Sequence, residues 1–180
     1  MVQSKQTNDR KRSVDVNIPT RALYTPEQRI KRDGSVWTLI QGVLAPIQFL
    51  VFLISLALVL RYLISGEGQN IAVWSIVIKT ITLYAIMITG CIWEKVVFDC
   101  YLFAPAFYWE DAFSMLVLAL HTGYLVAFFT GTLDNRELMY LALAAYLTYV
   151  INAAQFIWKL RTARLDHARQ IAINEHGLAA

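Results

Sequence analysis

Four carboxylates stand among aromatic rings in one short stretch, IWEKVVFDCYLFAPAFYWED, at residues 92–111. Two of them belong to matching pairs, Trp93-Glu94 and Trp109-Glu110, near the two ends of the stretch. A charged group beside apolar surface costs free energy unless something compensates it. In an apolar, ring-lined pocket a carboxylic acid retains its proton more readily, because desolvation disfavours the charged form, and it is then suited to donate that proton at neutral pH. The stretch therefore predicts proton transfer.

Polar side chains recur at helical spacing in the apolar segments around this stretch. They form four stripes: Gln41, Gln48 and Ser55; Lys79, Gly90 and Glu94; Glu110, Ser114, His121 and Tyr124; and Tyr149, Asn152, Gln155 and Lys159. Inside a membrane a polar group costs free energy unless it has a partner or lines a wet cavity. One stripe on each segment predicts a helical bundle with a polar interior.

The depths of these polar groups in the membrane predict a funnel-shaped polar interior that opens toward the cytoplasm and closes near His121. His121 follows Asp111 by about 15 Å of helix, which places it near the midplane of a ~30 Å apolar core. Glu110 and His121 are nearly eclipsed but about 16 Å apart, so they are expected to hold different parts of a ligand. Lys79 is predicted to lie beyond the midplane, nearer the opposite face.

Structural explanations compete with each of these functional ones. The tryptophans and tyrosines are also typical of an interfacial aromatic belt, and the amides are typical of interhelical hydrogen bonds. Glu110 could be an N-terminal charge on its helix, and Glu94 an ion-pair partner of Lys95. His121, at the midplane, is the hardest of these residues to explain structurally.

The elements that must position these groups are membrane-spanning helices. Apolar residues make up 57% of the 180-residue chain and charged residues 16%, below the soluble norm of about 25%. Four segments are near the ~20 residues that a bilayer helix needs: 36–64, 71–93, 112–131 and 137–158. The predicted fold is an all-α, integral membrane four-helix bundle, occupying residues 23–166.

The distribution of basic residues predicts the orientation. Eight of the sixteen Lys and Arg residues precede the first span, and the loops at 65–70 and 132–136 contain only Arg136. By the positive-inside rule both termini are expected to be cytoplasmic. Residues 1–22 are predicted to be a disordered arm, and 167–180 a polar tail. Thr25, Pro26 and Gln28 predict a capped interfacial helix before the first span.

Several classes of site are excluded by what the sequence lacks. It contains no Cys/His metal set, no Ser-His-Asp order, no Gly-rich phosphate loop and no flavin or nicotinamide fingerprint. The net charge of +3 is explained by the membrane topology, and no nucleic-acid footprint is visible. What remains is proton chemistry on a flat, hydrophobic, membrane-dissolved molecule.

Three blocks of the chain carry a resemblance to a known family. They are Trp93-Glu94-Lys95, Phe103-Ala104-Pro105, and Trp109-Glu110-Asp111 through His121-Thr122. With their flanking helices they resemble the 3-vinyl bacteriochlorophyllide hydratase family, over roughly residues 23–166. The resemblance implies addition of water to the C3-vinyl group of chlorophyllide a in bacteriochlorophyll synthesis. It also implies no cofactor, a bacterial inner or intracytoplasmic photosynthetic membrane, and chlorophyllide, lipids and other enzymes of this synthesis as partners.

Within this reaction, roles can be assigned to the candidate residues. The predicted catalytic residues are Glu110, Asp111, Glu94 and His121. The predicted substrate-binding residues are Trp93, Trp109, Phe107, Tyr108, Gln41, Gln48, Ser114, Tyr124, Asn152 and Gln155. Glu110 is the expected proton donor, with the like charges of Asp111 and Glu94 favouring its protonated form. Trp93 and Trp109 are expected to flank the ring, and His121 to bind the substrate's magnesium or a buried water.

Two other classes of function stay open at this point. A non-enzymatic pigment-binding or assembly subunit would need a magnesium ligand and aromatic rings, but no proton donor. A small transporter would be expected to show an internal repeat or interrupted helices. In this sequence, Pro46 is the one feature that suggests an interrupted helix.

Overall fold

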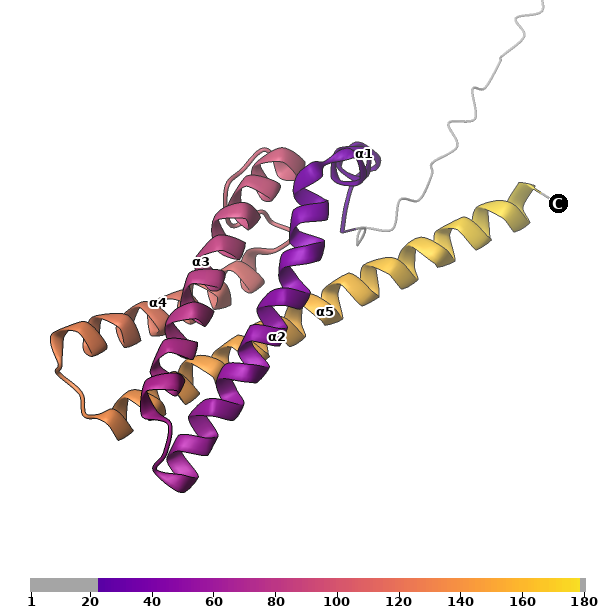
Figure 1. The fold of residues 1–180 in the computed structure, drawn as a ribbon. Helices are drawn as coiled ribbons and strands as arrows, with labels where there is room; N and C mark the ends of the chain where they lie inside the picture. Colours follow the sequence, from indigo (N-terminus) through magenta and orange to yellow (C-terminus); the bar gives the residue numbers. More distant parts are fainter. Residues whose placement is uncertain (1–22, 179–180) are drawn as a thin grey trace, which may run out of the picture.

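The computed structural model describes residues 23–178, and this part of the chain is all-helical (Figure 1). Its helices are α1 (Pro26–Gly34), α2 (Val36–Ser65), α3 (Gln69–Phe98), α4 (Tyr108–Thr130) and α5 (Asn135–Leu178). The helices α2 to α5 are long and apolar enough to cross a membrane. The predicted four-helix membrane bundle is therefore confirmed, whereas the predicted arm at 1–22 lies outside the described residues.

The helices extend beyond the predicted spans. α3 runs from Gln69 to Phe98, α4 begins at Tyr108 instead of at residue 112, and α5 continues through the predicted tail to Leu178. Polar residues at the ends of a span do not interrupt the backbone hydrogen bonds of a helix, so hydropathy alone underestimates its length. The early start of α4 matters for the site, because it brings Glu110 and Asp111 into the first helical turn.

The predicted capping box of α1 is present. The Thr25 hydroxyl accepts a hydrogen bond from the Gln28 amide at 3.2 Å, and the Gln28 side chain accepts one from the Thr25 amide at 2.9 Å. Ser35 then caps α2 by accepting from the Trp37 amide at 3.2 Å. The two caps place α1 across the end of α2, where Figure 1 shows it. We call this end of the bundle the α1 end.

The four long helices form two hairpins, α2 with α3 and α4 with α5. At the far end the hairpins close through glycine: Gly66 and Gly131 cap α2 and α4 with φ of 76° and 64°. This left-handed conformation is open to glycine without a Cβ penalty. Pro46 lies inside α2, and the helix continues through it.

Two separate groups of buried apolar side chains hold the hairpins together. The larger fills the far half of the bundle, where the Phe52 ring packs against Tyr146 and Tyr149 with centroids 5.4 Å and 4.9 Å away. The smaller lies at the α1 end and is built on Tyr24, Val97 and Phe107. Many large apolar side chains on the outer faces are exposed, as lipid contact requires. Between the two groups the hairpins separate, and this leaves a pocket.

Candidate active site

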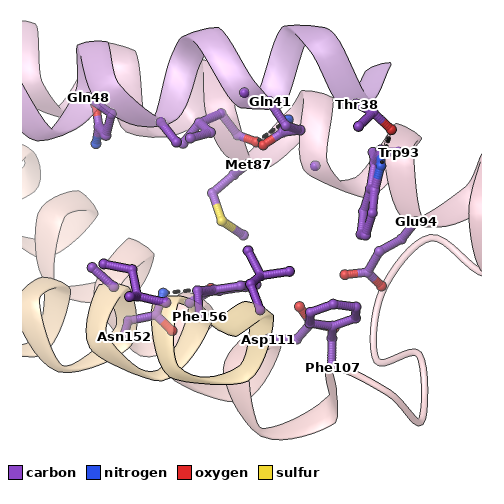
Figure 2. A pocket seen from close by; sticks show the side chains of 18 of the residues that line it. Thr38, Gln41, Gln48, Met87, Trp93, Glu94, Phe107, Asp111, Asn152 and Phe156 are labelled. Atoms are coloured by element: carbon purple, nitrogen blue, oxygen red, sulfur yellow. Dashed lines mark hydrogen bonds between the residues drawn. The ribbon is translucent and has the colours of Figure 1, made fainter. Parts of the chain in front are cut away.

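The pocket has a volume of about 840 Å³ and is lined by all five helices. Small-molecule and cofactor sites typically enclose about 300–1,000 Å³ and combine apolar walls with a few polar groups. The apolar lining here includes Leu83, Ile86, Met87, Val117, Phe156, Ile157 and Leu160. Figure 2 shows Met87 directed into the space between α2 and α5. The pocket is thus suited to a large, flat, apolar ligand.

Two carboxyl groups meet at one end of the pocket. Glu94 comes from the last turns of α3 and Asp111 from the first turn of α4, and their side chains interact with each other. Both residues are buried, with exposures of 6% and 4%, and both line the pocket beside Phe107 (Figure 2). We call Glu94 and Asp111 the carboxyl pair.

The connection between α3 and α4 supplies hydrogen bonds to this carboxyl pair. The Phe103 amide donates to Asp111 Oδ2 at 2.8 Å, and the Ala104 amide lies 3.5 Å from Glu94 Oε2. Phe103 has a φ of 59°, a region that costs a bulky residue about 1–3 kcal/mol. The strained turn directs consecutive amides at the two acids, so the loop orients the carboxyl pair.

Aromatic rings form the walls next to the carboxyl pair. The Trp93 and Phe107 rings lie edge to face at 5.7 Å, and Phe107 stacks on Phe156 of α5 at 5.9 Å. The Trp93 indole donates to the Thr38 hydroxyl at 2.9 Å, and that hydroxyl donates to the Arg32 carbonyl at 2.6 Å. The Trp93 ring is therefore held in position by α1 and α2.

Glu110, predicted as the proton donor, has a different environment. Its Oε2 lies 2.6 Å from Lys159 Nζ of α5, and that ammonium sits 5.0 Å from the Phe107 ring centroid. Glu110 does not appear in the lining of the pocket, which Asp111 reaches from the next position. Glu110 is thus engaged by Lys159, whereas the carboxyl pair faces the pocket. The donor role predicted for Glu110 stays a prediction.

Polar groups also line the middle of the pocket. Asn152 Nδ2 donates to Ser114 Oγ at 2.8 Å, and Gln41 Nε2 donates to Thr89 Oγ1 at 2.6 Å. The Gln48 side-chain carbonyl accepts from a threonine hydroxyl of α3. Asn152 Oδ1 and Gln48 Nε2 are buried and have no hydrogen-bond partner among the described residues. These two atoms remain available to a ligand or to water.

His121 lies below the pocket floor. Its Nδ1 is 2.8 Å from the Val117 carbonyl oxygen; because a carbonyl only accepts, this nitrogen carries the proton and Nε2 has the lone pair. Nε2 is buried without a partner among residues 23–178, and the ring lies 5.9 Å from that of Tyr146. A histidine nitrogen with a free lone pair can bind a metal ion. His121 does not line the pocket, however, although its neighbour Val117 does. Its contact with a substrate magnesium therefore stays a prediction.

The structure brings some of the predicted residues together and leaves others out. Glu94, Asp111, Trp93, Phe107, Gln41, Gln48, Ser114 and Asn152 line the pocket. Glu110, His121, Trp109, Tyr108, Tyr124 and Gln155 do not. The prediction that Trp93 and Trp109 flank one ring is wrong for this structure, because Trp109 is 70% exposed. The early start of α4 turns Tyr108 and Trp109 to the outer face.

Met87 and Phe156 are pocket residues that the sequence reasoning missed. Met87 precedes Glu94 by seven residues and Phe156 follows Asn152 by four, so both lie on polar stripes that had already been identified. Helical spacing was a signal for them, but an apolar side chain at such a position is equally typical of core packing.

Comparisons with known proteins show the family of the chain. The family model for 2-vinyl bacteriochlorophyllide hydratase matches residues 24–162. The chain belongs to this family. A 2-vinyl bacteriochlorophyllide hydratase of Rhodobacter capsulatus is 62% identical over 156 residues, covering 87% of this chain and 91% of that relative. One of Cereibacter sphaeroides is 66% identical over 148 residues, covering 82% and 92%. No solved structure matches the chain.

The part matched by the hydratase family contains the end of the pocket where the carboxyl pair lies. Residues 24–162 include the carboxyl pair, Trp93, Phe107, Ser114 and Asn152. The charged residues Arg164 and Asp166, which also line the pocket, lie just beyond it. An enzyme that hydrates a carbon–carbon double bond needs a proton donor beside an apolar cavity, and the geometry of the carboxyl pair meets that need.

Proposed function

We propose that this protein adds water to the C3-vinyl group of chlorophyllide a and so forms 3-(1-hydroxyethyl)chlorophyllide a. The vinyl position numbered 2 in the names of its relatives is position 3 in systematic tetrapyrrole numbering. The observation that carries the proposal is the buried Glu94–Asp111 carboxyl pair at the end of an apolar pocket of about 840 Å³. Two carboxyl groups in contact share a proton, because two like charges repel each other in an apolar site.

The reaction follows from the placement of this proton. The carboxyl pair transfers it to the terminal carbon of the vinyl group, and the π bond breaks. The cation that remains on the inner carbon is delocalised into the macrocycle. Water forms a carbon–oxygen bond to that carbon, and a proton from this water returns to the carboxylate. One H and one OH are added in total, so the step needs no oxidant, no reductant and no cofactor.

The attacking water needs to be held near the carboxyl pair. Ser114 follows Asp111 by about one turn on α4. Its hydroxyl oxygen accepts a hydrogen bond from the side-chain amide of Asn152 across the pocket, at 2.8 Å. We assign the water to this Ser114–Asn152 site, where Asn152 Oδ1 has no partner among the described residues. Residues three apart on a helix lie on one face, so proton donor and water would approach the same vinyl group.

The rest of the pocket would hold the macrocycle. The Trp93 and Phe107 rings flank the carboxyl end, and Met87 adapts to a flat surface, because its unbranched side chain fills irregular gaps. The magnesium belongs to the substrate. His121 would reach it only if the side chains between His121 and the pocket moved. We further propose a bacterial inner or intracytoplasmic membrane, with the α1 end in the cytoplasm, since basic residues concentrate there.

The test is product analysis with membranes that contain the protein. Incubation with chlorophyllide a should give the hydroxyethyl product, whose absorption shifts to shorter wavelength because the vinyl conjugation is lost. Glu94→Gln and Asp111→Asn keep the shapes and disrupt the shared proton. Each should lower turnover by ~10²-fold or more, while pigment binding, followed by absorption, stays near normal.

Two outcomes would contradict this assignment. If wild-type membranes bound chlorophyllide stoichiometrically but did not convert it, the protein would be a pigment-binding subunit. If both variants hydrated the substrate at the wild-type rate, the carboxyl pair would not be the proton donor.

A further inference from the structure

Charged side chains line the pocket in two places within the described part of the chain. One is the carboxyl pair, and the other is a group of side chains on two further helices, Arg29, Arg32 and Asp33 on α1 and Arg164 and Asp166 on α5. Three guanidinium groups outnumber two carboxylates at this second place. The hydration chemistry uses none of them. We call Arg29, Arg32 and Arg164 the arginine rim.

Arg32 has defined contacts within α1 and with Tyr24. Its guanidinium carbon lies 4.6 Å from the Tyr24 ring centroid, and its Nε and Nη2 both contact one oxygen of Asp33, at 2.8 Å and 2.7 Å. Burial raises the pKa of the Tyr24 phenol, so this ring stays neutral and does not cancel the charge of Arg32. A guanidinium has five N–H donors, so donors remain for another acceptor.

Arg32 is also tied to the pocket wall. Its backbone carbonyl accepts from Thr38, whose hydroxyl accepts from the Trp93 indole. Arg164 reaches the rim from α5 and is exposed. The rim therefore combines a half-buried guanidinium on α1 with an exposed one on α5, and both border the same cavity.

A chlorophyllide brings an anion that the apolar pocket does not accommodate. It is the free acid, with no long-chain alcohol esterified to its propionate side chain, so that side chain is a carboxylate at neutral pH. Burying a carboxylate without a partner is strongly unfavourable. Guanidinium groups match carboxylates in charge and in fork geometry, and such charge-assisted hydrogen bonds are among the strong ones.

We infer that the arginine rim binds the propionate carboxylate of the substrate and so sets the orientation of the macrocycle. The inference rests on the proposed function. The C3-vinyl and C17-propionate groups stand on different pyrrole-type rings of the macrocycle. Holding the propionate at the rim fixes which edge of the macrocycle faces the carboxyl pair. The rim thereby selects free acids over esterified pigments.

Lys79 is a further cation near the pocket, beside Tyr149 of its lining. Its Nζ lies 4.0 Å from the Tyr149 ring centroid and has no hydrogen-bond partner among the described residues. Lys79 is fully buried in the far half of the bundle and does not line the pocket. The rim residues border the cavity directly, and this favours them over Lys79 as the carboxylate site.

The test compares chlorophyllide a with its propionate methyl ester, which keeps the vinyl group and removes the charge. Wild-type membranes should hydrate both, with kcat/KM about tenfold or more higher for the acid, as expected for charge-assisted hydrogen bonds. Arg32→Gln and Arg164→Gln should each reduce this acid-to-ester ratio toward one by raising KM for the acid. Turnover of the ester should change less than about twofold.

Control variants distinguish a loss of carboxylate binding at the arginine rim from a general effect of removing a positive charge or destabilising the protein. Arg136 is exposed near the α4–α5 turn, at the other end of the bundle, so Arg136→Gln removes the same charge and should leave the ratio at the wild-type value. Arg164 is also exposed, so its variant keeps the test valid if Arg32→Gln fails to fold. Arg32→Lys should retain part of the preference.

The inference would be overturned by an unchanged acid-to-ester ratio in Arg164→Gln and Arg32→Gln. It would also be overturned if Lys79→Met abolished the preference while the rim variants kept it, because the carboxylate would then bind in the far half. Failure of the proposed function looks different: wild-type membranes would hydrate neither the acid nor the ester.

Discussion

Glu94 and Glu110 each follow a tryptophan, and at the residue level they are equivalent. Their surroundings separate them. Glu110 meets Lys159 across α4 and α5 at 2.6 Å, whereas Glu94 meets another acid, Asp111, inside the pocket. From these partners we expect Glu110 to contribute to structure and the carboxyl pair to act in acid catalysis, as proposed above.

Glu110→Gln should therefore affect stability more than catalysis. The pair is largely buried, with side-chain exposures of 10% for Glu110 and 26% for Lys159, so breaking it leaves an ammonium without its partner at a cost of about 1–3 kcal/mol. We expect a lower Tm in detergent and turnover within a few-fold of wild type. The double variant Glu110→Gln/Lys159→Gln should recover part of the stability. A ~10²-fold loss of turnover at unchanged Tm would return the donor role to Glu110.

At the scale of elements, the connection between α3 and α4 is the part that assembles the site. Asp99 and Phe103 both have positive φ, 63° and 59°, and the turn they make brings the end of one hairpin's helix to the start of the other's. The Phe103 and Ala104 amides then reach the two acids. Local strain of this kind persists only when the surrounding contacts compensate it.

Substitution of Phe103 tests this account. Glycine adopts a φ near +60° without strain and keeps the amide, so Phe103→Gly should retain turnover within a few-fold and keep or raise Tm. Valine is β-branched and disfavours this conformation, so Phe103→Val should lower both. The measurements are thermal unfolding in detergent and product formation from chlorophyllide a. Equal behaviour of the two variants would show that the backbone conformation of this loop does not matter.

The described part of the chain consists of two hairpins, α2 with α3 and α4 with α5, and the short helix α1. The far half is filled by the larger apolar core, and the smaller core at the α1 end encloses Tyr24 and Phe107. The pocket lies between these cores and receives side chains from every helix; Figure 2 shows those of α2, α3, α4 and α5 that it labels. An enzyme for a membrane-dissolved pigment needs such an opening between helices, because neither hairpin alone would enclose a flat macrocycle.

Orientation in the membrane is a prediction at this scale. With the α1 end cytoplasmic, a cysteine introduced for Gly34 at the end of α1 should react with a membrane-impermeant maleimide only from the cytoplasmic face. One introduced for Glu67 in the α2–α3 turn should react only from the opposite face. Both residues are exposed, and the native Cys91 and Cys100 would first be replaced by alanine. Labelling with the reverse sidedness would contradict the proposed topology.

The sequence by itself determined the membrane-spanning helices and the inner face of each one. Apolar length and 3.6-residue periodicity are local properties, and they correctly placed Gln48, Ser55, Ser114 and His121 on buried faces. The Thr25 capping box was equally predictable, because both partners lie within three residues of each other. The pocket residues Ser114 and Asn152 were members of these stripes, whereas Trp93 and Phe107 were predicted from the ring-rich stretch at 92–111.

Only the tertiary structure decided which buried groups meet. Lys159 and Glu110 are far apart in the chain and pair because α4 and α5 form a hairpin. The start of α4 at Tyr108 turned Trp109 outward, and a hydropathy pattern does not define such a boundary to the residue. The carboxyl pair and the arginine rim likewise depend on how two hairpins and α1 are placed together. Periodicity fixes the face of a helix, but rotation and separation between helices depend on packing across the whole bundle.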